Sequence, residues 1–267
     1  MFVILFPILA LCGACITPLF TPISWWWAPL LWLGYFLGLY LLFFLIGMLL
    51  APFFSKKKPV KRPSRFARFL LVEAYALGLA FMGARCRVEG LEKLPPKGTT
   101  FLIVSNHLSN YDHMLMMVKL RRYPIAFISK PENFTIPFVG RYLWHSGFLS
   151  IDRGSARNAI RTVNETADRI KNGVMCYGVF PEGTRSRKGI LLPFHSGVFL
   201  SATKAKSPIL VIHMQNTEQI NRRGPFRPTR VKMDILAYLP TEYTTTHTDA
   251  QISEETRAMM LEKYPNP

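Results

Sequence analysis

The first feature of this sequence is the absence of charge from its start. No Asp, Glu, Lys or Arg occurs between Met1 and Phe54, although Lys and Arg outnumber Asp and Glu by 33 to 16 in the whole chain. The formal net charge of +17 therefore belongs entirely to the residues from Ser55 onward. An uncharged stretch of this length is untypical of a water-exposed domain surface, so the chain divides at Ser55 into an apolar part and a basic part.

Cysteine and metal-ligand patterns are also scarce. The cysteines, Cys12, Cys15, Cys86 and Cys176, do not suggest a disulfide framework. Cys12 and Cys15 have the spacing of a redox motif but lack the strand and helix pattern that surrounds one. The six histidines show no spacing typical of metal ligands. We therefore expect neither a disulfide scaffold nor a metal site.

The apolar part predicts a membrane-anchoring helical hairpin over residues 1–54. Two apolar runs, Phe2 to Phe20 and Ala28 to Phe54, each approach or exceed the ~20 residues that span a bilayer. The turn between them is followed by three tryptophans, which suit the head-group level of a membrane. The start lacks the basic region of a secretory signal, so we expect the hairpin to remain in the mature protein. It either spans the bilayer or, because it contains prolines, dips into one leaflet as a re-entrant hairpin.

Residues 55–84 predict a basic linker and a further helix. Positive charge between Ser55 and Arg65, directly beside an apolar segment, favours the cytoplasmic side of a membrane. We therefore expect an integral or monotopic membrane protein whose following domain faces the cytoplasm, against an anionic bilayer surface. Phe66 to Gly83 is mostly apolar and predicts a helix that either lies along the interface or docks on the domain.

Residues 85–267 predict one α/β domain with a largely parallel central sheet flanked by helices. Short β-rich runs alternate with helical runs, which is the pattern of parallel sheets. The expected strands are 85–89, 100–105, 125–129, 148–151, 174–180, 209–214 and 230–235. The clearest helix is 156–172, capped by Ser155, with an apolar face of Ala156, Ala159, Ile160, Val163, Ala167 and Ile170. The stretch 241–267 predicts one short helix.

A histidine and an aspartate stand at the expected end of the second strand. His107 follows that strand and Asp112 opens the next helical run, which places the pair at the carboxyl edge of the sheet, where open α/β folds bind ligands. Residues five apart on one helix point about 140° away from each other, so the two side chains meet only if His107 precedes the helix. Ser109 as N-cap supplies that break. Asp112 would then orient His107 as a base, or it only caps the helix.

Two further segments follow expected strands. Phe180 to Ser186 contains Glu182, Gly183, Thr184 and Arg185, where the glycine permits close backbone approach and the arginine offers a forked donor to phosphate. Gly147 to Arg153 places Arg153 after a short strand and just before the helix capped by Ser155, which suits an anion. Each segment by itself is also compatible with an ordinary surface turn.

Together the three segments resemble the glycerophosphate acyltransferase superfamily, and in particular the 1-acylglycerol-3-phosphate O-acyltransferases. The His-x4-Asp motif is met by His107 and Asp112, the Ile/Val-Asp-Arg block by Ile151 to Arg153, and the Phe-Pro-Glu-Gly-Thr-Arg-Ser block by Phe180 to Ser186. The resemblance covers roughly residues 88–214. The fourth block of the family usually holds two prolines, and here only Pro208 remains, which leaves acyl-chain preference open.

The resemblance implies transfer of an acyl group from a thioester to the sn-2 hydroxyl of lysophosphatidate, which forms phosphatidate in phospholipid biosynthesis. His107 and Asp112 would be the catalytic pair. The acceptor's phosphate and glycerol would be held by Arg153, Glu182, Gly183, Thr184 and Arg185, with Lys130 as a weaker candidate. We expect no tightly bound cofactor; acyl-CoA or the acyl form of acyl carrier protein would be the co-substrate.

Two alternatives remain open at this point. Within the class, the acceptor could be glycerol 3-phosphate or another lysolipid. From another class, the chain could be a membrane-tethered module that binds anions or nucleic acid without chemistry. Nucleic-acid binding is disfavoured because Lys and Arg gather beside the apolar part and in the motifs, and are not interleaved with aromatic residues on one face.

Overall fold

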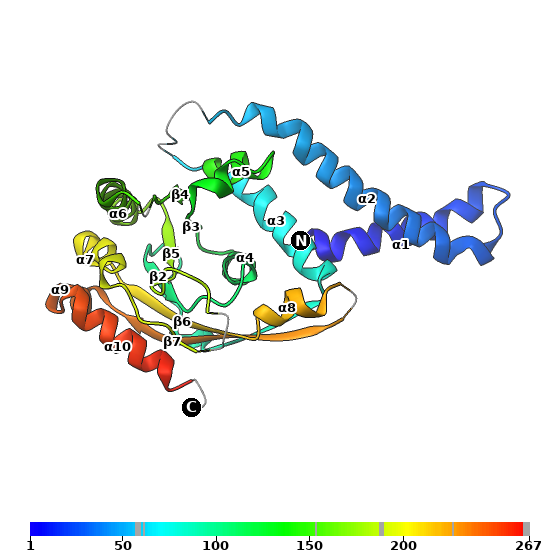
Figure 1. The fold of residues 1–267 in the computed structure, drawn as a ribbon. Coiled ribbons are helices and arrows are strands. Elements are labelled where there is room, and N and C mark those ends of the chain that lie inside the picture. Colours follow the sequence, from blue (N-terminus) through cyan, green and yellow to red (C-terminus); the bar gives the residue numbers. More distant parts are fainter. Residues whose placement is uncertain (57–59, 61, 153, 187–189, 226, 264–267) are drawn as a thin grey trace.

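Two long apolar helices project from one side of an α/β domain (Figure 1). The structure is a computed structural model that describes residues 1–56, 60, 62–152, 154–186, 190–225 and 227–263. The projecting helices are α1 (Phe2–Phe20) and α2 (Ala28–Leu50), joined through the 3-10 turn η1 (Trp25–Trp27) and followed by η2 (Ala51–Phe53). Both are long and apolar enough to cross a membrane by length and composition, which fits membrane association.

Most of the hairpin's large apolar side chains have no protein to cover them. Trp26 is 91% exposed and Phe20 is 83% exposed, and leucines along both helices are more than half exposed. In water such a surface would be strongly unfavourable, since each buried large apolar side chain gains about 1.5–3 kcal/mol. The hairpin is therefore built for an apolar environment outside the protein.

Both ends of the hairpin are fastened to the domain. At the start of α1, the Phe2 N–H donates to the buried carboxylate of Glu73 at 2.9 Å, and Arg121 lies 3.1 Å from the other oxygen of that carboxylate. At the end of α2, the Tyr142 hydroxyl donates to the Gly47 carbonyl oxygen at 2.6 Å. Because Glu73 and Tyr142 lie on different helices of the domain, the hairpin is held at two separate points.

The domain is built on a seven-stranded sheet with the order β1-β7-β6-β2-β5-β3-β4. Among the described residues, the β6–β7 pair is antiparallel and the other strand pairs are parallel. The strands are β1 (Ala84–Glu89), β2 (Leu102–Ser105), β3 (Ile125–Ser129), β4 (Leu149–Ser150), β5 (Cys176–Val179), β6 (Ile209–Gln215) and β7 (Thr229–Leu239). All seven expected strands are present, and the predicted fold class is confirmed.

Helices cover both faces of this sheet (Figure 1). One side carries α3 (Arg65–Phe81), α4 (Tyr111–Lys119), α5 (Val139–His145) and α8 (Glu218–Arg223), and the other carries α6 (Ala156–Lys171), α7 (Leu200–Ala205), α9 (Thr241–Thr246) and α10 (Asp249–Leu261). Short 3-10 turns are η3 (Leu91–Lys93), η4 (Pro131–Phe134) and η5 (Ser196–Val198). The central strands are therefore buried on both faces, and every residue of β2 is fully buried.

Two local expectations need correction or sharpening. The helix expected at 66–83 is α3, and it docks on the domain core, with residues such as Leu71, Leu77 and Leu79 buried. The chain from 241 onward forms two helices, α9 and α10, where one was expected. The second of them packs against the domain through Ile252 and Met260, which gives it a structural role.

The predicted apolar face of α6 was partly wrong. Its buried residues are Thr162, Thr166, Ala167 and Ile170, whereas Ile160 is 54% exposed. The two threonines can be buried because their hydroxyls donate to backbone carbonyl oxygens, that of Thr162 to Ser150 at 2.8 Å and that of Thr166 to Thr162 at 2.8 Å. The expected buried face was therefore placed wrongly around the helix axis, because the prediction counted only apolar residues and left out the two buried threonines.

Candidate active site

The predicted site residues gather because four neighbouring strands end at one edge of the sheet. Strands β2, β5, β3 and β4 are adjacent and parallel, so their carboxyl ends face the same way. His107 follows β2, the Glu182 to Arg185 turn follows β5, and Lys130 follows β3. Arg153 follows β4 in the sequence and lies outside the described residues.

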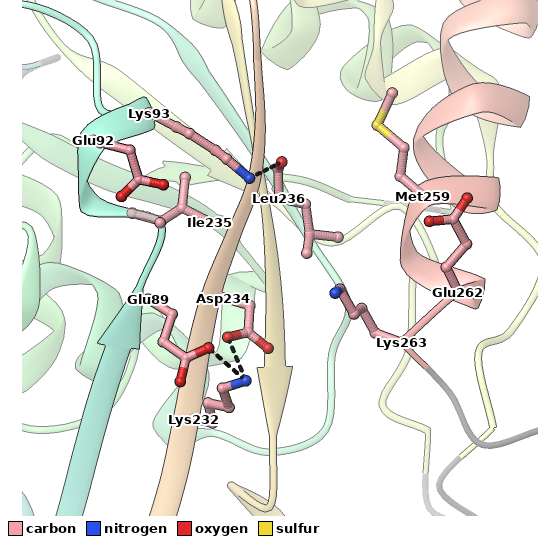
Figure 2. A pocket seen from close by; sticks show the side chains of 11 residues that line it. Glu89, Glu92, Lys93, Lys232, Asp234, Ile235, Leu236, Met259, Glu262 and Lys263 are labelled. Atoms are coloured by element: carbon pink, nitrogen blue, oxygen red, sulfur yellow. Dashed lines mark hydrogen bonds and ion pairs between the residues drawn. The ribbon is translucent and has the colours of Figure 1, made fainter.

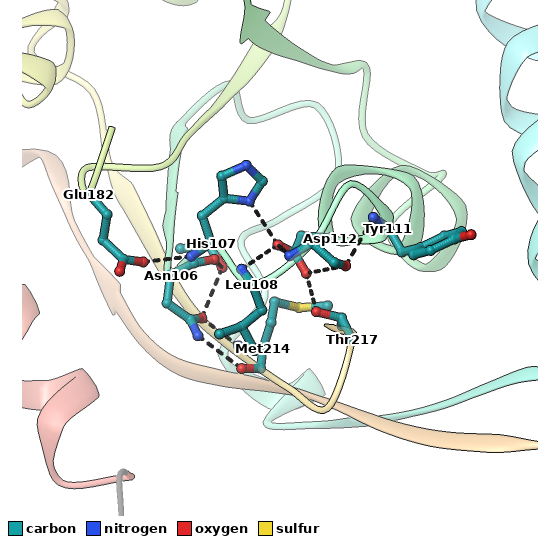
Figure 3. A network of polar contacts seen from close by, with 10 residues as sticks. Asn106, His107, Leu108, Tyr111, Asp112, Glu182, Met214 and Thr217 are labelled. Atoms are coloured by element: carbon teal, nitrogen blue, oxygen red, sulfur yellow. Dashed lines mark hydrogen bonds and ion pairs between the residues drawn. The ribbon is translucent and has the colours of Figure 1, made fainter. Parts of the chain in front are cut away.

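His107 and Asp112 form a hydrogen-bonded pair at this edge (Figure 3). The distance from His107 Nδ1 to Asp112 Oδ2 is 2.8 Å. The Asp112 side chain is fully buried, while that of His107 is 19% exposed. With Nδ1–H donating to the carboxylate, the imidazole's other nitrogen, Nε2, points away from Asp112 and carries the lone pair.

Asp112 also holds the turn that places His107 before the helix. Its Oδ2 accepts the backbone N–H of Leu108 at 2.8 Å and of Ser109 at 2.8 Å. The hydroxyl of Ser109 in turn accepts the N–H of Tyr111, the first residue of α4, at 3.1 Å. One carboxylate therefore contacts both the His107 ring and the backbone of the turn before α4. The N-cap of that helix is Asn110, one residue after the expected Ser109.

An aromatic stack fixes the plane of the His107 ring. Phe180 lies parallel to it, with ring centroids 4.0 Å apart and an interplanar angle of 15°. Phe127 stacks in turn on Phe180, with centroids 5.6 Å apart. One face of the imidazole is thereby shielded from water by Phe180, while 19% of the His107 side chain remains exposed.

Glu182 supports His107 through the backbone. One carboxylate oxygen accepts the His107 N–H at 2.7 Å and the other accepts the Leu192 N–H at 3.0 Å. The side chain is only 3% exposed, and burial raises the pKa of this carboxyl above its usual value. The Ser186 N–H donates to the His107 carbonyl oxygen at 2.8 Å. The turn after β5 therefore binds both the N–H and the carbonyl oxygen of His107.

Arg185, Thr184 and Lys130 are exposed at the same edge. Arg185 and Thr184 lie in the turn whose Gly183 has φ +68°, a left-handed conformation that favours glycine. Lys130 directly follows β3, next to β5 in the sheet. Two cationic side chains on neighbouring strand ends can meet a phosphate that arrives from outside.

Several backbone N–H groups near His107 are already committed. Those of His107, Leu108 and Ser109 donate to carboxylates, and that of Gly183 donates to the Phe180 carbonyl oxygen at 3.0 Å. The N–H groups of Thr184 and Arg185 donate to no acceptor within the described part of the chain. The Gly183 turn therefore offers backbone donors beside the histidine, whereas the first part of the His107 turn does not.

Two further histidines, His113 and His213, are buried outside the pair. His113, although next to Asp112 in the sequence, lies edge-on against Tyr75 and Phe127, with ring centroids 5.5 and 5.7 Å apart. Burial lowers its pKa to about 4, so it is neutral at neutral pH. Burial likewise lowers the pKa of His213, on β6, to about 4. Among the described residues, no group of three His, Cys, Asp or Glu side chains is placed to hold a metal ion.

A cavity of about 380 Å³ lies away from the motif residues, between β1, η3, β7 and α10 (Figure 2). Lys232 spans its floor with ion pairs to Glu89 at 2.7 Å and to Asp234 at 3.1 Å. Its lining residues include none of the predicted site residues. These ion pairs link the edge strand β1 to β7, which gives the charged side chains there a structural role.

The chain is similar to known acyltransferases. A family model described as Acyltransferase matches residues 85–215. The 1-acyl-sn-glycerol-3-phosphate acyltransferase alpha of Mus musculus is 32% identical over 202 residues, covering 74% of this chain and 68% of the mouse protein. The 1-acyl-sn-glycerol-3-phosphate acyltransferase of Escherichia coli (strain K12) is 35% identical over 116 residues, covering 43% of this chain and 47% of that protein.

A solved structure has the same fold. The crystal structure of the 1-acyl-sn-glycerophosphate (LPA) acyltransferase PlsC from Thermotoga maritima aligns with a TM-score of 0.61 and 23% identity, covering 85% of this chain and 95% of that chain. The residues that the family model matches include β2 to β6 and therefore the carboxyl ends of β2, β5, β3 and β4. With the mouse relative, this match shows that the class of protein is an acyltransferase. The chain belongs to the family of 1-acyl-sn-glycerol-3-phosphate acyltransferases.

Some residues at this site were not expected from the sequence. Asn106 pairs its side-chain amide with the backbone of Met214, accepting its N–H at 2.7 Å and donating to its carbonyl at 2.9 Å. The Thr217 hydroxyl donates to Asp112 Oδ1. Both contacts join the β2 end to the β6 end across more than a hundred residues, and no local sequence pattern signals them.

Proposed function

We propose that this chain esterifies the free sn-2 hydroxyl of lysophosphatidate with an acyl group from a thioester, forming phosphatidate, with His107 as the general base. The observation that carries the proposal is the 2.8 Å hydrogen bond from His107 Nδ1 to the buried Asp112, which leaves Nε2 of the partly exposed imidazole directed away from Asp112. The names of the relatives supply the acceptor. Histidine is the side chain most often used to accept a proton near neutral pH.

The reaction needs only one protein base. Nε2 of His107 removes the proton from the acceptor hydroxyl while that oxygen attacks the thioester carbonyl carbon. The carbon–sulfur bond then breaks, and the imidazolium returns the proton to the departing thiolate. Asp112 holds the imidazole in the required tautomer throughout, through the contact at Nδ1. No acyl-enzyme forms, because the substrate hydroxyl is itself the nucleophile.

The Gly183 turn is placed to stabilise two negative charges, the oxyanion of the thioester carbonyl and the phosphate of the acceptor. The free N–H groups of Thr184 and Arg185 would donate to the oxyanion that develops on the thioester carbonyl, a contribution typically of about 2.7–4 kcal/mol per donor. The side chains of Arg185, Arg153 and Lys130 would bind the acceptor's phosphate. The contacts of Glu182 support assigning it to holding His107, and not to direct binding of the glycerol.

The partners follow from charge and from the hairpin. The basic part of the chain, with all of the formal net charge of +17, would bind the cytoplasmic surface of an anionic bilayer, from which the lysolipid acceptor arrives. The donor would be acyl-CoA or the acyl form of acyl carrier protein, both of which are polyanionic, and no tightly bound cofactor takes part.

The test is acyl transfer by detergent-purified protein given lysophosphatidate and each donor type. His107→Ala should lose at least about a hundredfold in kcat, since general-base catalysis typically contributes 10²–10⁴-fold. His247→Ala, at the end of α9, is the matched control and should retain wild-type turnover. Near-normal turnover in a folded His107→Ala variant would refute the mechanism. Competition with glycerol 3-phosphate and other lysolipids checks the acceptor, and faster acylation of one of these would overturn its identity.

A further inference from the structure

Thr217 makes a contact that neither the motifs nor the family assignment explains. Its side chain is fully buried, and its hydroxyl hydrogen-bonds Asp112 Oδ1. A carboxylate has no proton to give, so the threonine hydroxyl is the donor. The residue comes from the turn after β6, more than a hundred positions from Asp112, and contacts the carboxylate oxygen that does not bind the His107 ring (Figure 3).

The two oxygens of Asp112 have different partners. Oδ2 accepts three hydrogen bonds of 2.8 Å, from His107 Nδ1 and from the N–H groups of Leu108 and Ser109. Oδ1 accepts from Thr217 and, at 3.4 Å, from the Ser109 hydroxyl. The contact from Ser109 is long for an O–H donor to an oxygen. Thr217 is therefore the principal partner of Oδ1.

The turn after β6 is shaped to direct this hydroxyl inward. Asn216 has φ +63°, a left-handed conformation that asparagine tolerates better than most residues. Thr217 then occupies the N-cap position of α8, where threonine hydroxyls usually accept an N–H of the first helical turn. Here the hydroxyl makes no such cap bond and points to Asp112. The Thr217 hydroxyl therefore binds Asp112 and does not cap α8.

We infer that Thr217 is a positioning residue for the acyl transfer, holding the Asp112 carboxylate so that Oδ2 stays aimed at His107 Nδ1. Without the hydroxyl, the fully buried Asp112 Oδ1 keeps only the long Ser109 contact within the described part of the chain, which leaves it short of donors. The carboxylate is then expected to rotate toward other donors. The imidazole then loses its fixed orientation. This inference rests on the proposed role of His107 as the base.

The decisive variant is Thr217→Val, which keeps the shape of the side chain and removes the hydroxyl. Substitution of a group that orients a site residue typically costs about 10- to 100-fold in function, so kcat should fall by that factor. KM for acceptor and donor should stay within about twofold, because a fully buried side chain does not contact either substrate. Thr217→Ser restores the donor and should recover most of the wild-type kcat.

Matched controls separate positioning from a general loss of stability. Thr256→Val removes another fully buried threonine hydroxyl, which donates to the Ile252 carbonyl oxygen within α10. It should leave kcat unchanged. In an Asp112→Asn background the effect of Thr217→Val should shrink to less than about twofold, because two residues that act through one contact are not additive.

Three results would overturn the inference: wild-type kcat in Thr217→Val, equal loss in Thr217→Ser, or the same fold-loss in the Asp112→Asn background. If Thr217→Val does not accumulate as folded protein, Thr217→Cys replaces it, since a thiol is a weak donor of similar size. That variant should show the same fall in kcat, and wild-type kcat would again overturn the inference. A normal Thr217→Val beside an inactive His107→Ala refutes only Thr217, whereas an active His107→Ala refutes the proposed function.

Discussion

At the scale of single residues, two buried carboxylates organise the site. Asp112 connects the His107 ring to the turn that precedes α4. Glu182 connects the His107 backbone to the chain near Leu192. Each carboxylate oxygen therefore has a protein donor, which offsets the cost of removing a charged group from water. The histidine is fixed by its ring on one side and by its peptide on the other.

The Glu182 carboxyl gives a prediction for stability against pH. Burial raises its pKa in the folded state above its usual value of 4.5. Between these two values the folded protein binds more protons than the unfolded chain, so this group lowers stability as pH rises from about 4.5 through the raised pKa. Glu182→Gln removes the titration. We expect the melting temperature of wild type relative to Glu182→Gln to fall over that pH range.

The measurement is thermal unfolding of both proteins in the same detergent at pH values from 4 to 8. Glu254→Gln, on the exposed part of α10, is the matched control for the loss of one carboxylate from the chain. A wild-type melting temperature that rises with pH relative to that of Glu182→Gln would contradict the assignment. That outcome would mean that the two backbone N–H donors outweigh the effect of burial.

At the scale of elements, the middle of β5 sets the aromatic stack behind His107. Gly178 lies on β5 under the Phe127 ring, and a Cβ built there would come within 2.1 Å of Phe127 Cε1. Phe127 in turn stacks on Phe180, which stacks on His107. The glycine is therefore required by close approach, and not by its backbone angle. It permits β5 and β3 to place the stack against the site.

Gly178→Ala should lower both stability and activity. The added methyl group cannot fit beside a ring that is only 2% exposed, and overpacking of this kind typically costs about 1–3 kcal/mol. The displaced ring would push Phe180 and change the plane of His107, so kcat should fall as well. Thermal unfolding and the acyl-transfer assay give the two readouts.

Gly78→Ala is the control for this substitution. Gly78 lies in α3, and a Cβ there would meet nothing within 4 Å. Alanine favours a helix interior by about 0.8–1.0 kcal/mol over glycine, so the control should match or exceed wild-type stability. If Gly178→Ala behaved in the same way, the proposed stack geometry would be wrong.

At the scale of the whole molecule, the hairpin and the domain form one unit. The two attachment points, at Glu73 and at Tyr142, connect the membrane segment to α3 and α5, and these helices lie on the same side of the sheet as α4 (Figure 1). The His107 to Asp112 turn leads into α4. The turn that carries His107 therefore leads into a helix on the side of the sheet to which the hairpin is attached.

The exposed apolar surface of α2 should bring the protein to membranes. Leu37 and Leu41 are one turn apart, and they are 56% and 71% exposed. A carboxylate at the centre of an apolar helix costs about 2.5–3.5 kcal/mol on insertion. The double variant Leu37→Asp with Leu41→Asp should therefore reduce the fraction bound to anionic liposomes at least tenfold, as measured by flotation.

The domain itself should not respond to that change. Turnover of detergent-dispersed substrate by the double variant should stay near wild type, because both leucines lie outside the domain. Ile160→Asp is the matched control, since Ile160 is 54% exposed on α6 and lies outside the hairpin. Unchanged liposome binding by the double variant, or equal loss in Ile160→Asp, would contradict membrane attachment through the hairpin.

The sequence by itself predicted the seven strands of the sheet, the two long apolar helices and the meeting of His107 with Asp112. Alternation of β-rich and helical runs predicted all seven strands, because strand and helix periodicities are local. The uncharged start predicted the two long helices for the same reason. The spacing of His107 and Asp112, with Ser109 between them, predicted a pair that meets before α4, since helix geometry forbids the alternative.

Only the tertiary structure decided which residues support that pair. Glu182 was expected to shape the glycerol site, yet its oxygens bind the backbone N–H groups of His107 and Leu192. Thr217 lies at the start of α8, where a threonine indicates no more than a helix cap. Its contact with Asp112 exists because β6 pairs with β2 and brings the two strand ends together. Strand order is set by packing between segments far apart in the chain, so the hydrophobic periodicity within one segment does not predict it.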